Sequence, residues 1–248
     1  MIVCLDIETG YDYSPEQREH HRQKLLAKLP TEVKADSRLT DPKKIEANLA
    51  KKRADLEKKK KEVDDQVQEW VDKTPLSPLT GRIVAVAVAT KIVSDDSCNE
   101  ITWKPEVFTA KTPDEEGPML EAVGKFLREQ RCSQLVTFNG KQFDLPYMMA
   151  RAMKHQVEME WKLPVKRWDR RHIDLRDTLT KGKLEAWSRQ ILGCGKLNGI
   201  DGSEVPKMAA KGEWDRLEKY AKQDVILNGQ LYDRLLAVAD VAPVRKDS

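Results

Sequence analysis

The stretch Ile2-Val3-Cys4-Leu5-Asp6-Ile7-Glu8-Thr9 sets two carboxylates inside an otherwise apolar run. The apolar residues favour a buried strand. A charge in such a strand is costly unless it is paired or bound to a metal ion, so the usual surface role of acidic residues fits poorly here. Side chains alternate along a strand, which puts Asp6 and Glu8 on the same face. We therefore predict that both carboxylates are functional.

Two further motifs end in a carboxylate. Asn139-Gly140-Lys141-Gln142-Phe143-Asp144 lies at mid-chain, and Tyr220-Ala221-Lys222-Gln223-Asp224 lies near the end. Tyr220 and Asp224 are one turn apart on a predicted late helix, so they share a face of that helix. Each motif is weak alone in a chain with 41 acidic residues. The combination of the motifs is a specific signal, because their order, spacing and predicted structural context agree.

Together the three motifs predict a metal-dependent phosphodiester site. Four hard oxygen donors gathered at one point suit a pair of Mg²⁺ or Mn²⁺ ions. Two such ions about 3.5–4 Å apart can hold the attacking and leaving oxygens of an in-line attack on a phosphodiester. The predicted ligands are Asp6, Glu8, Asp144 and Asp224, and the phenol of Tyr220 would orient the attacking water.

These motifs resemble the DEDD superfamily of 3′–5′ exonucleases, in the subclass with tyrosine in the third motif. The likeness is greatest to stand-alone exonucleases related to the proofreading domain of family B DNA polymerases. It covers residues 1–10 and roughly residue 81 to the end, and it includes the run His172-Ile173-Asp174-Leu175. The resemblance implies a single-stranded DNA substrate cut from its 3′ end, nucleoside 5′-monophosphate products and a role in DNA repair.

Two other functions stay open at this point. One is an RNA-directed 3′–5′ exonuclease of the same fold, because the 2′-hydroxyl separates RNA from DNA and no residue reports on it. The other is a nucleic-acid-binding module that has lost catalysis, although the intact carboxylate set argues against it. The sister subclass with histidine in the third motif is matched by His172 and Asp177. His172, however, lies in the predicted strand at 171–175, whereas the third motif should be on a late helix.

The resemblance also suggests residues that contact the substrate. Thr9 and Gly10 match positions that meet the terminal nucleotide, Asn139 matches the second-motif Asn that reaches the substrate strand, and Lys196 resembles a phosphate-facing Lys. Alternative roles are a turn-forming amide for Asn139 and a simple surface position for Lys196. The ring of Phe143 would either stack on a base or pack in the core.

Periodicity predicts an α/β fold with an RNase H-like mixed five-stranded sheet flanked by helices. We expect one domain over residues 1–248, with a charged helical insertion at 11–74 after the first strand. The predicted strands are 2–9, 81–90, 101–110, 134–138 and 171–175, and the predicted helices are 15–29, 42–71, 114–130, 145–155, 184–192, 205–210 and 212–238.

The predicted insertion is rich in charged residues. Asp41 is a plausible N-cap, with Pro42 at the first helical position. The apolar residues of the second helix recur every seven positions in a thin stripe, at Leu49, Leu56, Val63 and Trp70. We expect an arm over the sheet or a helical hairpin with Leu25, Leu26 and Leu29. The basic residues at 51–53 and 58–61 are either a solvated face, a DNA phosphate contact or a partner-protein contact.

Composition favours a soluble cytoplasmic enzyme. No stretch approaches the ~20 apolar residues that span a bilayer, and we expect neither a signal peptide nor room for one before the first strand. The cysteines form no Cys-x-x-Cys pair and no zinc spacing, which is typical of thiols in a reducing compartment; they are Cys4, Cys98, Cys132 and Cys194.

Overall fold

The structure is a computed structural model, and it describes residues 1–93, 101–166, 168–179, 181–195 and 201–239. The chain divides into two compact units. Met1–Gly10 and Gly81–Ser248 form the first unit, and Tyr11–Thr80 form the second. No helix within the described residues has the length and apolar character needed to cross a membrane.

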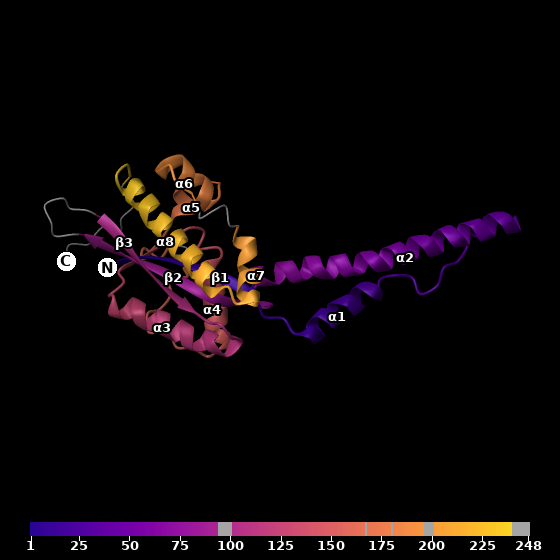
Figure 1. Cartoon of the computed structure of the whole chain (residues 1–248), viewed down its shortest axis with the longest axis horizontal. Helices are drawn as coiled ribbons and strands as arrows, with labels where there is room; N and C mark the ends of the chain where they lie inside the picture. The colour runs from indigo at the N-terminus through magenta and orange to yellow at the C-terminus, as the bar shows by residue number, and fades with distance from the viewer. Residues whose placement is uncertain (94–100, 167, 180, 196–200, 240–248) are drawn as a thin grey trace. The chain divides into compact units, whose positions relative to one another are not determined.

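The first unit is built on a five-stranded sheet in the order β3-β2-β1-β4-β5. Figure 1 labels β1, β2 and β3 of this sheet. Strand β1 pairs with β4 in parallel, β4 pairs with β5 in parallel, and β2 pairs with β3 antiparallel. This confirms the predicted mixed sheet of an α/β fold. The strands are β1 (Ile2–Tyr11), β2 (Gly81–Val93), β3 (Ile101–Thr109), β4 (Gln134–Thr137) and β5 (His172–Asp174).

The two faces of β1 pack against different helices. Val3, Leu5 and Ile7 belong to an apolar cluster that also contains buried residues of α3 (Glu116–Glu129) and α4 (Asp144–Lys154). Cys4, on the opposite face, belongs to a cluster with buried residues of α8 (Trp214–Leu236). Alternation of side chains along the strand therefore directs Asp6 and Glu8 towards the α8 side of the sheet.

The remaining helices of the first unit follow the predicted ones closely, with one addition. Helix α6 occupies Leu184–Leu192, and α7 occupies Val205–Lys211 and ends at Gly212, whose φ of 73° is the left-handed conformation common at a helix C-terminus. The addition is α5 (Leu175–Leu179). The predicted strand at 171–175 was too long, because Asp174 accepts a hydrogen bond from the Arg176 N–H at 3.0 Å and so starts a helical turn.

The second unit contains α1 (Pro15–Leu26) and α2 (Pro42–Lys73). The carboxylate of Asp41 accepts the Lys43 N–H at 2.9 Å, which confirms the predicted N-cap. The helices contact each other through an ion pair between Arg22 and Asp64 at 2.9 Å and through the His21 ring, which stacks on Trp70 with 4.6 Å between centroids.

The structure buries only part of the predicted apolar stripe of α2. The buried side chains of this helix are Val63, Val67 and Val71, which recur every four positions. Leu49 and Leu56 are only half-buried. The seven-residue spacing was based only on which residues are apolar. Burial instead depends on which face of the helix is covered, and residues at i, i+4 and i+8 lie on one face of a straight helix.

One carboxylate fixes the turn that leads into α4. Asp174, at the end of β5, accepts the N–H groups of Asn139 at 2.7 Å and of Lys141 at 2.9 Å, in addition to that of Arg176. Asn139 adopts a positive φ of 72°, a left-handed conformation that Asn tolerates better than most residues. Asp174 is 3% exposed, so these three hydrogen bonds are shielded from water. The side chain therefore holds the β4–α4 turn against the start of α5.

We predict a graded loss of stability when Asp174 is replaced. Asp174→Ala removes the acceptor of all three N–H groups and should lower the free energy of unfolding by about 3 kcal/mol. Asp174→Asn keeps one acceptor oxygen and should cost about 1 kcal/mol. Urea unfolding followed by circular dichroism measures both.

Asp177→Ala is the control for Asp174→Ala, because it removes a single exposed ion pair with Lys141 and should cost less than about 1 kcal/mol. Equal stability of the Asp174→Ala and Asp177→Ala variants would contradict the role given to Asp174.

Candidate functional site

The acidic residues of β1 lie side by side in the first unit. Glu8 is 7% exposed and Asp6 is half-buried. They are two residues apart on a strand whose neighbours Leu5 and Ile7 point into the opposite core. The same alternation that buries the apolar residues on one face therefore gathers the carboxylates on the other.

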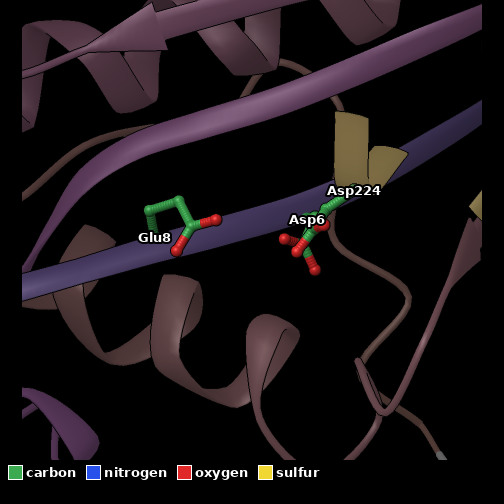
Figure 2. Close-up of side chains that lie close together, drawn as sticks. All are labelled: Asp6, Glu8 and Asp224. Atoms are coloured by element: carbon green, nitrogen blue, oxygen red, sulfur yellow. The ribbon is translucent and has the colours of Figure 1, made fainter. Parts of the chain in front are cut away.

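Helix α8 supplies the residues opposite them. Tyr220 and Asp224 are 2% and 3% exposed, and they lie one turn apart. Asp6, Glu8 and Asp224 each offer a carboxylate oxygen, and these three oxygens lie within 4.8 Å of one another (Figure 2). The structure thus brings together residues separated by more than 200 positions in the sequence.

Such a group of carboxylates is electrostatically unfavourable by itself. Like charges a few ångströms apart in a poorly solvated site repel, and a cation or a proton between them relieves the repulsion. The Tyr220 hydroxyl experiences the same field. Burial is the main cause that raises the pKa of Tyr220 above its usual range. The pKa is raised further by the charges of Asp224, Glu8 and Asp6 and by a hydrogen bond to Asp224.

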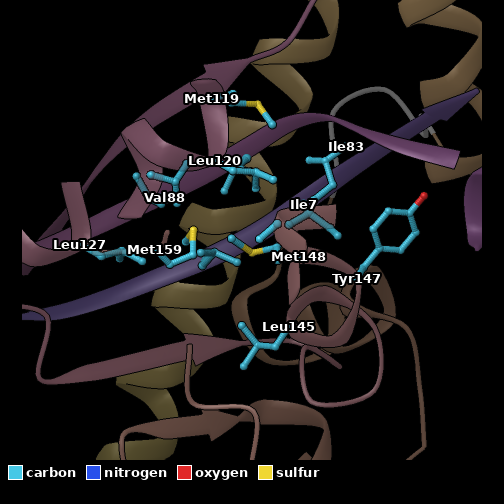
Figure 3. Packing of buried hydrophobic residues seen from close by; sticks show 14 of the residues in the cluster. Ile7, Ile83, Val88, Met119, Leu120, Leu127, Leu145, Tyr147, Met148 and Met159 are labelled. Atoms are coloured by element: carbon cyan, nitrogen blue, oxygen red, sulfur yellow. The ribbon is translucent and has the colours of Figure 1, made fainter. Parts of the chain in front are cut away.

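Asp144 belongs to the same cavity but is held differently. Its Oδ1 accepts the N–H of Ile7 at 3.0 Å, which joins the first turn of α4 to β1 between the two acidic residues of the strand. Burial raises the pKa of this carboxyl to about 7, and the charge of Asp174 adds to the increase. Figure 3 shows Leu145, Tyr147 and Met148 of α4 packed into the apolar core, which anchors the helix that presents Asp144.

A cavity of about 370 Å³ joins these side chains. Its volume is at the lower end of the range for small-molecule sites. Four charged residues line this cavity although no sequence motif indicated them. Arg176 lies on α5, Lys183 and Glu185 lie at the start of α6, and Asp201 lies in the turn before α7. The full lining is Asp6, Ile7, Glu8, Phe138, Asn139, Phe143, Asp144, Arg176, Gly182, Lys183, Leu184, Glu185, Asp201, Gly202, Tyr220 and Asp224.

Only some of the residues that were expected to contact the substrate line this cavity. Asn139 and Phe143 line the cavity, and Phe143 also packs against the core cluster with its ring 5.4 Å from that of Tyr147. Thr9 and Gly10 are not among the described residues that line it. A Cβ on Gly10 would come within 2.5 Å of Val84, so close strand packing explains that glycine. Lys196 lies outside the described residues.

Sequence reasoning missed Arg176, Lys183, Glu185 and Asp201, which line the cavity. Arg176 directly follows His172-Ile173-Asp174-Leu175, a run that is part of the resemblance. This position was the only feature of the sequence that could have indicated a role for Arg176 at the site. The other three belong to loops and helix starts whose place in space depends on how α6 and α7 pack on α8. Lys183 and Asp201 face each other with 3.5 Å between Nζ and Oδ2.

The histidine alternative for the third motif lies elsewhere. His172 is 4% exposed, and its Nε2 is 2.8 Å from the Thr137 hydroxyl. Burial lowers the pKa of His172 to about 4. The carboxylate of Asp177 is paired with Lys141 at 2.7 Å. Neither His172 nor Asp177 is among the described residues that line the acidic cavity.

Comparison with known proteins places the chain in a family. A family model for predicted 3′–5′ exonucleases related to the exonuclease domain of PolB matches residues 76–241. The family B DNA polymerase from the hyperthermophilic archaeon Pyrobaculum calidifontis is similar in structure, with a TM-score of 0.55 and 16% sequence identity. The match covers 95% of this chain and 24% of the polymerase, and at this identity it shows the fold alone. No curated protein sequence matches the chain.

The family match spans more than half of the chain. It includes Asp144, Tyr220 and Asp224. Asp6 and Glu8 precede the matched residues in the sequence, before the residues of the second unit. The structural comparison shows that the fold of this chain is similar to that of part of the polymerase. The chain belongs to the family of predicted 3′–5′ exonucleases related to the exonuclease domain of PolB.

Proposed function

We propose that this exonuclease is metal-dependent and removes nucleotides from the 3′ end of single-stranded DNA. One observation carries the proposal: carboxylate oxygens of Asp6, Glu8 and Asp224 lie within 4.8 Å of one another, in a cavity that Asp144 and Tyr220 also line. The products would be nucleoside 5′-monophosphates. A cavity of about 370 Å³ is consistent with a single splayed nucleotide at the end of a strand.

The donor set fits hard divalent cations. Asp6, Glu8, Asp144 and Asp224 offer only carboxylate oxygens, which suit Mg²⁺ or Mn²⁺ better than metals that favour imidazole or thiolate. Bound there, two such ions would activate a water molecule and stabilise the charge that develops on the leaving oxygen. The charge of four carboxylates is also what a site for two dications needs for balance.

Tyr220 belongs to the third motif of the tyrosine subclass in this proposal. Because its pKa is raised, the phenol stays protonated at neutral pH and is a poor general base. It would therefore orient the attacking water by hydrogen bonding, while a carboxylate or the bulk solvent takes the proton. Asn139 and Phe143 line the cavity and would contact the terminal nucleotides.

The metal assignment predicts a severe loss of cleavage in two variants. Asp6→Asn and Asp224→Asn each remove a charged oxygen without changing the side-chain shape, so kcat should fall by roughly 10³-fold or more. Asp215→Asn makes the same change at an exposed position on the same helix and should leave kcat unchanged. Release of nucleotides from matched 5′-labelled DNA and RNA strands with Mg²⁺ or Mn²⁺ measures activity, polarity and substrate preference.

Titration calorimetry with Mn²⁺ provides a readout that does not depend on turnover. Both variants should bind Mn²⁺ more weakly than the wild-type protein does. Because burial raises the pKa of Asp144 to about 7, its proton competes with the metal near and below that pH, and Mn²⁺ affinity should fall by about fivefold between pH 7 and pH 6. Full cleavage and unchanged Mn²⁺ affinity in either variant would sink the assignment. If the RNA strand is digested faster than the DNA strand, RNA rather than DNA is the substrate.

A second pair of variants separates the two third-motif candidates. Tyr220→Phe keeps the ring and deletes the hydroxyl, so it should lower kcat by about 10²-fold or more with little change in KM. His172→Gln should have a much smaller effect, because His172 lies outside the cavity. If the histidine change is the damaging one while the protein stays folded, the subclass assignment is wrong and Asp177 becomes the suspected ligand.

Residues 11–80 are proposed to be an appendage of one catalytic domain rather than part of its core. The three apolar clusters found in the described residues contain only residues of the first unit. Joining Gly10 to Gly81 through a short Gly/Ser linker should therefore give a protein that unfolds cooperatively and still cuts DNA, as thermal melting and the cleavage assay would report.

The same deletion tests whether the basic residues of α2 guide DNA. Loss of three or four Lys contacts to phosphate should flatten the slope of log K against log salt by about 2–3 units, at roughly 0.7 per phosphate for single strands. A stable deletion variant with an unchanged slope would rule out DNA guidance. A partner-protein contact would then be the better interpretation of the unit.

A further inference from the structure

We propose that a second cavity beside the acidic one is a phosphate subsite, with Arg176 as its anchor. It would hold the phosphodiester on the 5′ side of the scissile linkage, and so it positions the penultimate nucleotide. The inference rests on the proposed exonuclease function, because it names the part of the substrate that this cavity receives.

The two cavities are adjacent. The second one has a volume of about 370 Å³ and is lined by Asn139, Gln142, Arg176, Asp177 and Lys181. Asn139 and Arg176 also line the acidic cavity. A strand whose last nucleotide occupies the acidic cavity would pass over these two side chains as it leaves, and would then enter the second cavity.

The charges of the two cavities differ in sign. The acidic cavity carries the four proposed metal ligands, whereas the second is lined by Arg176, Lys181 and one carboxylate. That carboxylate, Asp177, is neutralised by Lys141 at 2.7 Å. Within the residues that the structure describes, no ion pair is formed by the guanidinium of Arg176 or the ammonium of Lys181. The second cavity therefore keeps net positive charge to attract a phosphate.

Arg176 is held in place on both sides. Its backbone N–H donates to Asp174 Oδ1 at 3.0 Å, and its Nη1 donates to Asn139 Oδ1 at 2.6 Å. The second hydrogen bond uses one of the five N–H donors of the guanidinium. A planar fork oriented in this way suits two-point recognition of a phosphate, and fixing it beforehand lowers the entropy cost of binding. The neutral amide of Asn139 orients the arginine without cancelling its charge.

The test combines a protein variant with a modified substrate. The substrates are a 5′-labelled single-stranded DNA and the same strand with an uncharged methylphosphonate at the penultimate linkage, and only release of the first nucleotide is measured. For Arg176→Gln on ordinary DNA we expect KM to rise about tenfold, with kcat within about twofold of wild type, because uniform binding is lost. Lys181→Gln should shift KM in the same direction by a smaller factor.

The methylphosphonate strand then isolates the contact. It should raise KM of the wild-type enzyme by about the same tenfold, and Arg176→Gln should add nothing further, since the variant and the modified strand remove the same interaction. Arg128→Gln is the matched control, because Arg128 is an exposed arginine on α3 that pairs with Glu160, and it should change neither parameter. Full additivity of the Arg176 variant and the modified linkage would overturn the proposal, as would an unchanged KM.

Failure of the proposed function is distinguishable from failure of the subsite. If wild-type protein cuts neither DNA nor RNA, the exonuclease proposal fails, and the subsite is then tested by fluorescence anisotropy of the labelled DNA strand in EDTA. Arg176→Gln should weaken that binding about fivefold to tenfold and flatten the salt slope by about 0.7. Unchanged affinity and slope would overturn the subsite.

Discussion

The site depends on one electrostatic constraint: carboxylates of β1 and α8 must stay close together where little water reaches them. Asp6, Glu8 and Asp224 have oxygens within 4.8 Å of one another, and such a group is costly without a compensating charge. The fold opposes that cost by placing the residues on rigid elements. β1 has a strand on each side in the sheet, and α8 is packed through its own apolar residues. Separation of the carboxylates would therefore require disrupting the core.

The opposite face of the sheet supplies the rigidity that this arrangement needs. The buried carboxylate of Glu116 on α3 pairs with Arg151 on α4 through Nε at 2.8 Å, and it also accepts the Ile83 N–H of β2 at 2.8 Å. These contacts tie α3, α4 and the sheet together. Asp144 lies at the other end of α4, where the N–H of Ile7 holds its Oδ1. The position of the fourth carboxylate is thus set from both ends of one helix.

A single buried carboxylate also fixes the loops around the site. Asp174 gathers three backbone N–H groups from two turns, and the residues that it positions include Asn139 and Arg176. One buried acid therefore shapes the boundary between the acidic cavity and its positively charged neighbour. His172 and Asp177, which resemble a catalytic pair in the sequence, are used instead in contacts with Thr137 and Lys141.

Local sequence determined the elements and the acidic residues. Alternation in β1 identified Asp6 and Glu8, and helical spacing paired Tyr220 with Asp224, because strand and helix periodicities depend only on neighbouring residues. The individual strands were predictable for the same reason, whereas the mixed five-stranded sheet was predicted from the order of strands and helices along the chain. Arg176, Lys183 and Asp201 were not, since a loop residue reaches a cavity only when distant elements pack. The burial of Val63, Val67 and Val71 likewise depended on which face of α2 was covered. Tertiary structure alone decided these features, because contacts between residues far apart in the chain leave no periodic trace in the sequence.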